Sequence, residues 1–393
     1  MAETESNTLS FDQMDLSREI LDAIRDMGFT EPSTVQQKTI PLMMEGHDIN
    51  AQAPTGTGKT CAFGIPMLEY VQLKDSRIQE IVLAPTRELA LQIGDELTRL
   101  AKYIQGCRIS VLYGGQPITK QLNQLKRKPQ IVVATPGRLL DHMQRGNIRL
   151  DAVHTMVLDE ADEMLNMGFV KDVTKIIEST PSDRQLVLFS ATTNQDVLTI
   201  AWKYQHDPVE ITVEATKKDR PQIAQYVIAT EHDRKIDDLL YLLDADVYQR
   251  IMIFCNTKFM TDRLTARLQK EGYNAQCIHG DIRQSQRNET MNGFRKGKFP
   301  ILIATDVAAR GIDVDDVEAV INFDLPQENE YYLHRIGRTG RAHKYGVSFS
   351  LVTFQESVRM DEILKYMIAK PLPLHFEDGV LRSEDGTPFF ENI

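Results

Sequence analysis

The sequence predicts an α/β protein of two domains, each a parallel sheet flanked by helices, with a flexible linker between them. Short apolar runs typical of buried strands alternate with longer segments of helical periodicity. Strands that alternate with helices favour parallel sheets covered on both faces. The alternation stops after residue 213 and restarts near residue 223, and 393 residues are enough for two hydrophobic cores.

The first predicted domain covers residues 1–213. We expect strands in its apolar runs, which are 81–84, 109–112, 131–134, 156–158 and 186–189. The segment 87–102 is predicted to be an amphipathic helix. Apolar residues recur on one of its faces at spacings of four, four and three, namely Leu89, Ile93, Leu97 and Leu100.

The second predicted domain covers residues 223–369. Its expected strands are the apolar runs 251–254, 275–278, 301–304, 319–322 and 348–352. The segment 214–222 is polar, contains Pro221 and lacks apolar periodicity, so it is predicted to be the linker. Residues 370–393 carry three prolines and two glycines, and we expect an irregular tail with a short hairpin over 380–388.

Composition and charge indicate a soluble globular protein, with 42% hydrophobic and 26% charged residues. No apolar run has the length of a membrane span, and the polar N-terminus lacks the apolar region of a signal peptide. The net charge of −11 argues only weakly against nucleic acid as a partner, because a binding groove needs local donors. Four cysteines without metal-ligand spacing are interpreted as reduced thiols of a cytoplasmic protein: Cys61, Cys107, Cys255 and Cys277.

Residues 53–60 have the glycine pattern of a phosphate-binding loop, with Ala53 where the usual pattern has glycine. Its glycines let backbone amides approach phosphate oxygens, and the following helix directs its N-terminal dipole at the anion. We expect Lys59 to neutralise the β- and γ-phosphates and Thr60 to offer its hydroxyl to Mg²⁺. The residues assigned to ATP in this segment are Pro54, Thr55, Gly56, Thr57, Gly58, Lys59 and Thr60.

Two adjacent carboxylates, Asp159 and Glu160, follow the apolar run 155–158 directly. We assign Asp159 to Mg²⁺ and Glu160 to orienting the attacking water. The alternative is a solvated acidic strand end, which accounts less well for two carboxylates at the position where ligands gather in α/β sheets. With the phosphate-binding loop, this pair predicts hydrolysis of a nucleoside triphosphate.

Further motifs accompany these two segments in a defined order. They are 28–36 with Phe11 upstream, 85–89, 114–115, 135–138, 159–162, 190–192, 254–257, 304–313 and 334–341. With them the chain resembles the DEAD-box RNA helicases of superfamily two over residues 11–368. Its length is similar to that of the translation-initiation member and of short bacterial members. The resemblance implies two RecA-like domains that close on ATP and RNA together.

The resemblance also implies roles around ATP. The amide of Gln36 can donate to and accept from the adenine edge, and Phe29 can stack on the base, with a core aromatic as the alternative for Phe29. Arg338 and Arg341 are expected to act as arginine fingers after closure, with a solvated helix face as the alternative. Glu31, Gly311 and Asp313 are assigned to the nucleotide, and Ser190, Thr192 and His334 to coupling.

The RNA-contacting motifs of the resemblance are rich in small residues rather than aromatic side chains. We expect contacts to phosphates and riboses that are independent of base sequence, with 2′-hydroxyl contacts favouring RNA over DNA. The residues assigned to RNA are Pro85, Thr86, Arg87, Gly114, Gly115, Thr135, Pro136, Gly137, Arg138, Asn256, Thr257, Thr305 and Arg310.

These observations together predict an ATP-dependent RNA helicase, an RNA-stimulated ATPase that uses ATP and Mg²⁺. It is expected to unwind short RNA duplexes or remodel RNA–protein complexes as a monomer, and protein cofactors that drive domain closure would fit the same scheme. An ATP-gated RNA clamp that serves as a binding scaffold would use the same residues and stays open as an alternative. A processive DNA helicase is disfavoured by Gln36 and by Ala161 in the acidic motif.

Overall fold

In the computed structural model of the chain, the described residues are 10–54, 56–192, 195–213, 222–309, 317–340, 345–367 and 369–390. Contacts divide the chain into two compact units, Met1–Asp219 and Arg220–Ile393, called here the first and the second unit. Several predicted features lie outside the described residues, namely 214–221 of the linker, Thr55, Arg310, Gly311, Asp313 and Arg341. The predicted linker and the roles of these residues therefore stay predictions.

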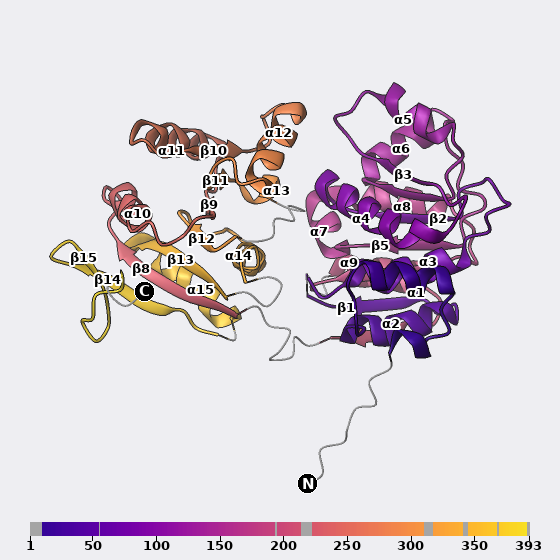
Figure 1. Cartoon of the computed structure of the whole chain (residues 1–393), viewed down its shortest axis with the longest axis horizontal. Helices are drawn as coiled ribbons and strands as arrows, with labels where there is room; N and C mark the ends of the chain where they lie inside the picture. Colours follow the sequence, from indigo (N-terminus) through magenta and orange to yellow (C-terminus); the bar gives the residue numbers. More distant parts are fainter. Residues whose placement is uncertain are drawn as a thin grey trace, which may run out of the picture. The chain divides into compact units, whose positions relative to one another are not determined.

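The first unit contains a seven-stranded sheet in the order β3-β4-β2-β5-β6-β1-β7, and all its strand pairs are parallel (Figure 1). The strands are β1 (Ile49–Gln52), β2 (Glu80–Leu83), β3 (Ile109–Leu112), β4 (Ile131–Ala134), β5 (Thr155–Leu158), β6 (Gln185–Ser190) and β7 (Val209–Thr212). All five apolar runs predicted for this half lie in the sheet. β1 and β7 have no predicted run, because polar residues such as Asn50 and Glu210 interrupt their apolar pattern.

Helices cover both faces of this sheet. They are η1 (Phe11–Gln13), α1 (Arg18–Asp26), α2 (Thr34–Met44), α3 (Lys59–Tyr70), α4 (Arg87–Leu100), η2 (Ala101–Tyr103), α5 (Ile118–Leu125), α6 (Pro136–Gln144), α7 (Ala161–Met164), η3 (Leu165–Phe169), α8 (Val170–Glu178) and α9 (Gln195–Tyr204). Successive strand residues point to opposite faces. Val82 and Val157 lie in a core with α1 to α4, whereas Ile81 and Met156 lie in a core with α6 to α9.

Helix α4 confirms the amphipathic helix predicted over 87–102. The four apolar residues that define its predicted face are all buried: Leu89, Ile93, Leu97 and Leu100. Thr86 begins the helix, since its side chain accepts a hydrogen bond from the backbone N–H of Leu89 at 3.3 Å.

The second unit contains an eight-stranded sheet in the order β10-β11-β9-β12-β13-β8-β14-β15 (Figure 1). Its strands are β8 (Gln222–Thr230), β9 (Ile251–Phe254), β10 (Ala275–Ile278), β11 (Ile301–Ala304), β12 (Ala319–Asn322), β13 (Tyr345–Thr353), β14 (Leu372–Glu377) and β15 (Val380–Ser383). All strand pairs are parallel except β14 with β15. β8 has no predicted run either, and it begins at Gln222, the last residue of the predicted linker.

The helices of the second unit also cover both faces of its sheet. They are α10 (Lys235–Asp244), α11 (Lys258–Lys270), α12 (Gln284–Arg295), α13 (Asp306–Ala309), α14 (Asn329–Ile336), η4 (Phe354–Glu356) and α15 (Ser357–Tyr366). Ile253 and Ile321 lie in one core, and their neighbours Met252 and Val320 lie in the core on the opposite face. The predicted α/β class is therefore confirmed in both units. Within the described ranges, no helix is both long enough and apolar enough to cross a bilayer.

The predicted irregular tail is wrong for residues 372–383. Strand β14 adds to the sheet in parallel with β8, and β15 pairs with β14 in the antiparallel sense. Asp378 and Gly379 form the turn with φ of 51° and 78°, the left-handed angles of a tight hairpin. Buried apolar side chains explain both strands, since Leu374 of β14 and Leu381 of β15 lie in the core of the second unit. In the segment 380–388, where a short hairpin is expected, the structure has a single antiparallel bridge between Arg382 and Pro388.

Candidate active site

The phosphate loop connects β1 to α3 in the first unit. Gly56 and Gly58 adopt φ angles of 81° and 86°, a left-handed conformation that residues with a Cβ rarely adopt. A Cβ at Gly58 would also lie 2.5 Å from Nε2 of Gln36, so a side chain there would displace the Gln36 amide from its bond to the Gly58 carbonyl oxygen. The loop leads directly into the first turn of α3, where backbone N–H groups form an anion-binding end.

Lys59 and Asp159 form a buried ion pair between the start of α3 and the end of β5. Their side chains are 7% and 4% exposed, and Nζ of Lys59 lies 3.8 Å from Oδ1 of Asp159. Burial raises the pKa of Asp159 to about 6, although Lys59 opposes the rise and Glu160 adds to it. A second cation beside this carboxylate would favour its charged form, so the position suits a metal ligand.

Glu160 turns the chain from β5 into α7. It adopts φ 49° and ψ 51°, an uncommon left-handed conformation for a residue with a Cβ. Its backbone N–H donates a hydrogen bond to Oδ1 of Asp159 at 3.0 Å, which fixes the orientation of that carboxylate. The two carboxylates thus follow one strand but are held differently: Asp159 by its ion pair and hydrogen bond, and Glu160 by its left-handed backbone conformation.

Asp162 links the acidic motif to the end of β6. It is buried, and its Oδ2 accepts hydrogen bonds from the backbone N–H groups of Ala191 and Thr192 at 3.1 and 2.8 Å and from the Thr192 hydroxyl at 2.8 Å. The sequence alone predicts no role for Asp162. Its position in the first turn of α7, three residues after Asp159, is the signal that points to this contact. Asp162 therefore joins the predicted coupling residue Thr192 to the hydrolysis motif.

Gln36 contacts the phosphate loop in the described structure. Its Oε1 accepts a hydrogen bond from the backbone N–H of Ser33 at 2.9 Å, and its Nε2 donates to the carbonyl oxygen of Gly58 at 3.0 Å. The Ser33 hydroxyl donates to the carbonyl oxygen of Thr57 at 2.7 Å. A primary amide has two N–H donors and two acceptor positions, so Gln36 retains one of each for an adenine base.

The other residues of this motif separate into exposed and buried positions. Phe29 lies in the connection between α1 and α2 with 39% of its surface exposed, so the alternative of a core aromatic is wrong. Glu31 is exposed in the same connection. Phe11, the upstream aromatic of the motif, is buried in the core of the first unit.

The RNA motifs of the first unit gather at the carboxyl ends of three neighbouring strands. Pro85 and Thr86 follow β2, Gly114 and Gly115 follow β3, and residues 135–138 follow β4. These strands are adjacent in the order β3-β4-β2. The ATP motifs follow β5, β6 and β1, which are adjacent on the other half of the same sheet. One sheet edge thus presents both predicted sites, as expected for a parallel α/β sheet.

Two of these loops are held by side chains from neighbouring elements. Gly115 has φ 80°, and a Cβ there would lie 2.3 Å from the guanidinium of Arg87. Arg138 donates to the carbonyl oxygen of Gln116 at 3.1 Å and to Oε1 of Gln121 at 3.0 Å. The buried His142 also contacts Oε1 of Gln121, at 3.0 Å. Arg138 therefore positions the loop after β3. This structural role is additional to the RNA contact predicted for it.

The RNA motifs of the second unit also follow neighbouring strands. Asn256 and Thr257 follow β9, and Thr305 follows β11, its neighbour in the sheet. Thr257 begins α11, because its side chain accepts from the backbone N–H of Met260 at 3.1 Å. The Asn256 amide donates to the carbonyl oxygen of Leu325 at 2.7 Å. Its predicted contact to RNA therefore competes with bonds inside the unit.

Arg335 is the centre of these bonds, although the sequence alone predicts no role for it. Its side chain is 1% exposed and forms a bidentate ion pair with Asp306 at 2.5 and 2.7 Å. It also donates to Oδ1 of Asn256 at 2.9 Å and to the carbonyl oxygen of Asp324 at 2.5 Å. One guanidinium thus joins the loops after β9, β11 and β12.

Arg338 lies at the other end of this sheet. Its Nε donates to the carbonyl oxygen of His334 at 3.2 Å, one turn earlier in α14 and its extension. It lines a cavity of about 560 Å³ with residues that precede β9, β11 and β12, including Arg250, Phe299 and Glu318. Within the second unit, Arg338 and the Asn256 loop therefore occupy opposite ends of the sheet. The alternative of a wholly solvated helix face does not describe Arg338, which is half-buried.

Comparison with known proteins assigns both units to one family. The family model for the DEAD/DEAH box helicase domain matches residues 33–200, and the model for the helicase conserved C-terminal domain matches residues 234–343. The chain belongs to the DEAD-box RNA helicase family. A DEAD-box ATP-dependent RNA helicase CshA of Geobacillus kaustophilus is 46% identical to it over 354 residues, 90% of this chain and 76% of that protein.

Further DEAD-box proteins support this membership. An ATP-dependent RNA helicase CshA of Listeria monocytogenes is 44% identical over 346 residues, which are 88% of this chain and 66% of that protein. The solved structure of S. cerevisiae Dbp5 bound to RNA and ADP BeF3 has a TM-score of 0.84 at 32% identity, covering 94% of this chain and 96% of that chain. Mss116p bound to ssRNA and AMP-PNP has a TM-score of 0.85 at 30% identity, covering 95% and 81%. The resemblance inferred from the motifs is thereby confirmed, as are the two RecA-like folds.

Proposed function

We propose that this DEAD-box protein is an RNA-stimulated ATPase that converts ATP to ADP and phosphate and locally unwinds short RNA duplexes or remodels RNA–protein complexes. The observation that carries the proposal is the buried pair of Lys59 and Asp159, 3.8 Å apart beside the glycine turn of the phosphate loop. A buried charge pair of this kind adds little stability compared with packed apolar residues, whereas it suits the binding of a charged ligand.

The proposed hydrolysis uses four side chains of the first unit. Lys59 neutralises the β- and γ-phosphates, and Glu160 orients the attacking water. Asp159 and Thr60 would hold Mg²⁺, because a carboxylate and a hydroxyl are the hard oxygen ligands this cation prefers. The raised pKa of Asp159 fits this role, since the carboxylate lacks a full counter-charge in its buried position. Bound Mg²⁺ supplies charge neutralisation between the phosphates.

Selection of ATP is proposed to depend on the remaining hydrogen-bonding capacity of Gln36. Its amide can pair with the adenine edge in both directions, which guanine does not match. Phe29 offers an exposed ring for stacking on the base. Gln36 also donates a hydrogen bond to the carbonyl oxygen of Gly58. The same side chain would therefore connect a bound adenine to the phosphate loop.

RNA is proposed to bind at two sets of loops, those after β2, β3 and β4 in the first unit and those after β9 and β11 in the second unit. Small residues and helix N-termini there suit phosphate and ribose contacts without base preference. Arg338 and Arg341 are proposed as arginine fingers that reach the γ-phosphate when ATP and RNA bring the two units together. Protein cofactors that promote closure fit this scheme, and we propose a monomer that acts in the cytoplasm.

RNA-stimulated ATP turnover tests the proposed function. Wild type should hydrolyse ATP faster with RNA, and Lys59→Ala should abolish turnover because the phosphate charge loses its cation. Lys74→Ala, which removes an exposed lysine of the same unit, is the matched control and should retain activity. Turnover at the wild-type rate in a pure Lys59→Ala preparation would refute the site. Slow turnover with long retention of RNA by the wild type would favour the clamp alternative instead.

A further inference from the structure

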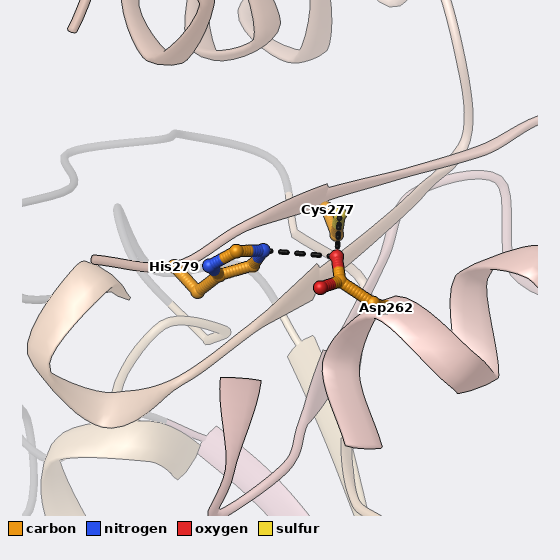
Figure 2. Close-up of side chains that lie close together, drawn as sticks. All are labelled: Asp262, Cys277 and His279. Atoms are coloured by element: carbon orange, nitrogen blue, oxygen red, sulfur yellow. Dashed lines mark hydrogen bonds and ion pairs between the residues drawn. The ribbon is translucent and has the colours of Figure 1, made fainter. Parts of the chain in front are cut away.

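Three potential metal ligands meet in the second unit, beside the RNA-assigned Thr305, whose backbone N–H donates to the carbonyl oxygen of Ile278 at 3.4 Å. Asp262 belongs to α11, Cys277 to β10, and His279 follows β10 directly (Figure 2). Their ligand atoms all lie within 4.8 Å of one another. The sequence gives no indication of this group, because the linear spacing of the cysteines is not that of a metal motif. Only pairing of the strand with the helix brings the three side chains together.

Oδ1 of Asp262 lies at the centre of the group. Nε2 of His279 lies 2.9 Å from it, and the Cys277 thiol donates to it across 3.6 Å (Figure 2). In a tetrahedral zinc site with ordinary bond lengths, sulfur and oxygen ligands lie about 3.6 Å apart, and nitrogen and oxygen ligands about 3.4 Å apart. The first distance already agrees, and the second requires an opening of about 0.5 Å. Asp262 can supply this movement, because its side chain is 61% exposed.

The supporting elements hold the other two ligands in place. Cys277 is paired in register with Ile303 of β11, and the ring of His279 is only 7% exposed. Asp281, two residues after His279, forms an ion pair with Lys258 at 2.5 Å, so that ammonium group is already paired. One exposed carboxylate therefore closes on two ligands whose positions are fixed.

The three side chains also match a divalent cation in charge and in chemical type. A thiolate and a carboxylate supply two negative charges, and the imidazole supplies a neutral nitrogen. Sulfur, nitrogen and oxygen together favour zinc-class ions over Mg²⁺, which prefers oxygen ligands alone. Burial raises the pKa of the Cys277 thiol. A hydrogen bond with Thr265 lowers it, and the carboxylate of Asp262 raises it again, so binding must displace the thiol proton.

Binding through the imidazole of His279 also requires the ring proton to leave the nitrogen atom that binds the metal. Nδ1 of His279 accepts from the backbone N–H of Asp281 at 3.4 Å, which leaves the ring proton on Nε2, facing Asp262. Ligation through Nε2 moves this proton away and gives up the bond to Asp281. That bond is long for a hydrogen bond, so little is lost by breaking it.

We propose that Asp262, Cys277 and His279 form a binding site for a zinc-class divalent cation, with a fourth position open to water. Its effect would be to tie β10 to α11. Strand β10 is at the edge of the sheet and pairs with β11 alone among the described strands. A cation that binds the folded second unit stabilises it in proportion to the logarithm of its concentration.

Titration of the full chain with Co²⁺, without nucleotide, tests this proposal. Cobalt substitutes for zinc and gives thiolate-to-metal absorption only where a cysteine is a ligand, so binding at the sulfur-free phosphate site does not interfere. Wild type is expected to bind one equivalent with this absorption and to release it to Zn²⁺. Cys277→Ser should lose the absorption, and Asp262→Asn should weaken binding at least about tenfold, because one of three ligands is lost. Cys107→Ser and Asp237→Asn, matched changes outside the group, should behave as wild type.

Thermal unfolding supplies a second readout. Zn²⁺ should raise the unfolding temperature of wild type and of the two control variants, and should leave that of Cys277→Ser unchanged. Asp262 is exposed, so Asp262→Asn keeps the test informative if the cysteine variant fails to fold. No thiolate absorption in wild type would overturn the proposal. Absorption that persists in folded Cys277→Ser, or that is as tight in Asp262→Asn as in wild type, would overturn it as well.

Discussion

Replacing Asp162 by asparagine is expected to separate ATP hydrolysis from RNA unwinding. One oxygen of Asp162 accepts three hydrogen bonds from Ala191 and Thr192. Bonds to a charged acceptor contribute about 1.5–3 kcal/mol each, and bonds between neutral groups about 0.5–1.5 kcal/mol. The three bonds share one acceptor and are not additive, so the combined loss is about 1–3 kcal/mol. If this energy couples the two functions, unwinding should fall about 5- to 150-fold.

The assay for this variant compares two rates on the same short RNA duplex. ATP turnover should stay near the wild-type rate, because the pair of Lys59 and Asp159 is unchanged, while strand displacement falls. Asp183→Asn, an exposed aspartate of the same unit, is the matched control and should alter neither rate. An equal loss of turnover and displacement in Asp162→Asn would show that Asp162 supports the hydrolysis site itself and would refute the reasoning.

Three further predictions concern other parts of the chain. Burial raises the pKa of Asp159 from an ordinary value of 3.8 to about 6 in the folded protein. This carboxyl group therefore stabilises the fold by about 3 kcal/mol below about pH 4, and that contribution is lost as the pH rises through 6. Chemical unfolding without Mg²⁺ should show this decrease for wild type but not for Asp159→Asn; equal pH profiles would contradict it. Gln36→Ala should reduce the preference for ATP over GTP, measured by competition for turnover, and unchanged discrimination would count against the adenine contact. Leu374→Ala should destabilise the second unit by about 2–5 kcal/mol in urea unfolding, because the side chain is buried between β14 and the core. Leu372→Ala, at a position 62% exposed in the same strand, should have little effect; equal losses would mean that β14 does not pack as described.

Much of the fold could be predicted because the sheets are parallel and buried on both faces. Such strands are continuous apolar runs, as in 131–134 and 301–304, and those runs stand out between helical segments. Strand β1 has the sequence Ile-Asn-Ala-Gln and was missed for the lack of such a run. In β14, Pro373 suggested irregular structure, although proline is tolerated in strands near a sheet edge.

The candidate site was predictable where its chemistry is local in sequence. The phosphate loop and the acidic pair each occupy a few consecutive residues, and the structure brings Lys59 to within 3.8 Å of Asp159. Asp162 and Arg335 were missed because their roles depend on partners about thirty residues away or more, such as Thr192 and Asp306. The sequence does not distinguish a buried arginine or aspartate from an exposed one. Only the folded structure shows which groups such a side chain contacts.

ATP and RNA are expected to bind to this chain with coupled free energies. The most direct test is a titration of labelled RNA with and without a non-hydrolysable ATP analogue, for wild type, Arg338→Ala and the control Arg267→Ala. The analogue should raise the affinity of wild type for RNA about 5- to 150-fold, and RNA should raise the affinity for the analogue by the same factor. Arg338→Ala should reduce this factor, while Arg267→Ala, at an exposed arginine of α11, should preserve it. Identical RNA affinities of wild type with and without the analogue would contradict the account, even if ATP hydrolysis itself were observed.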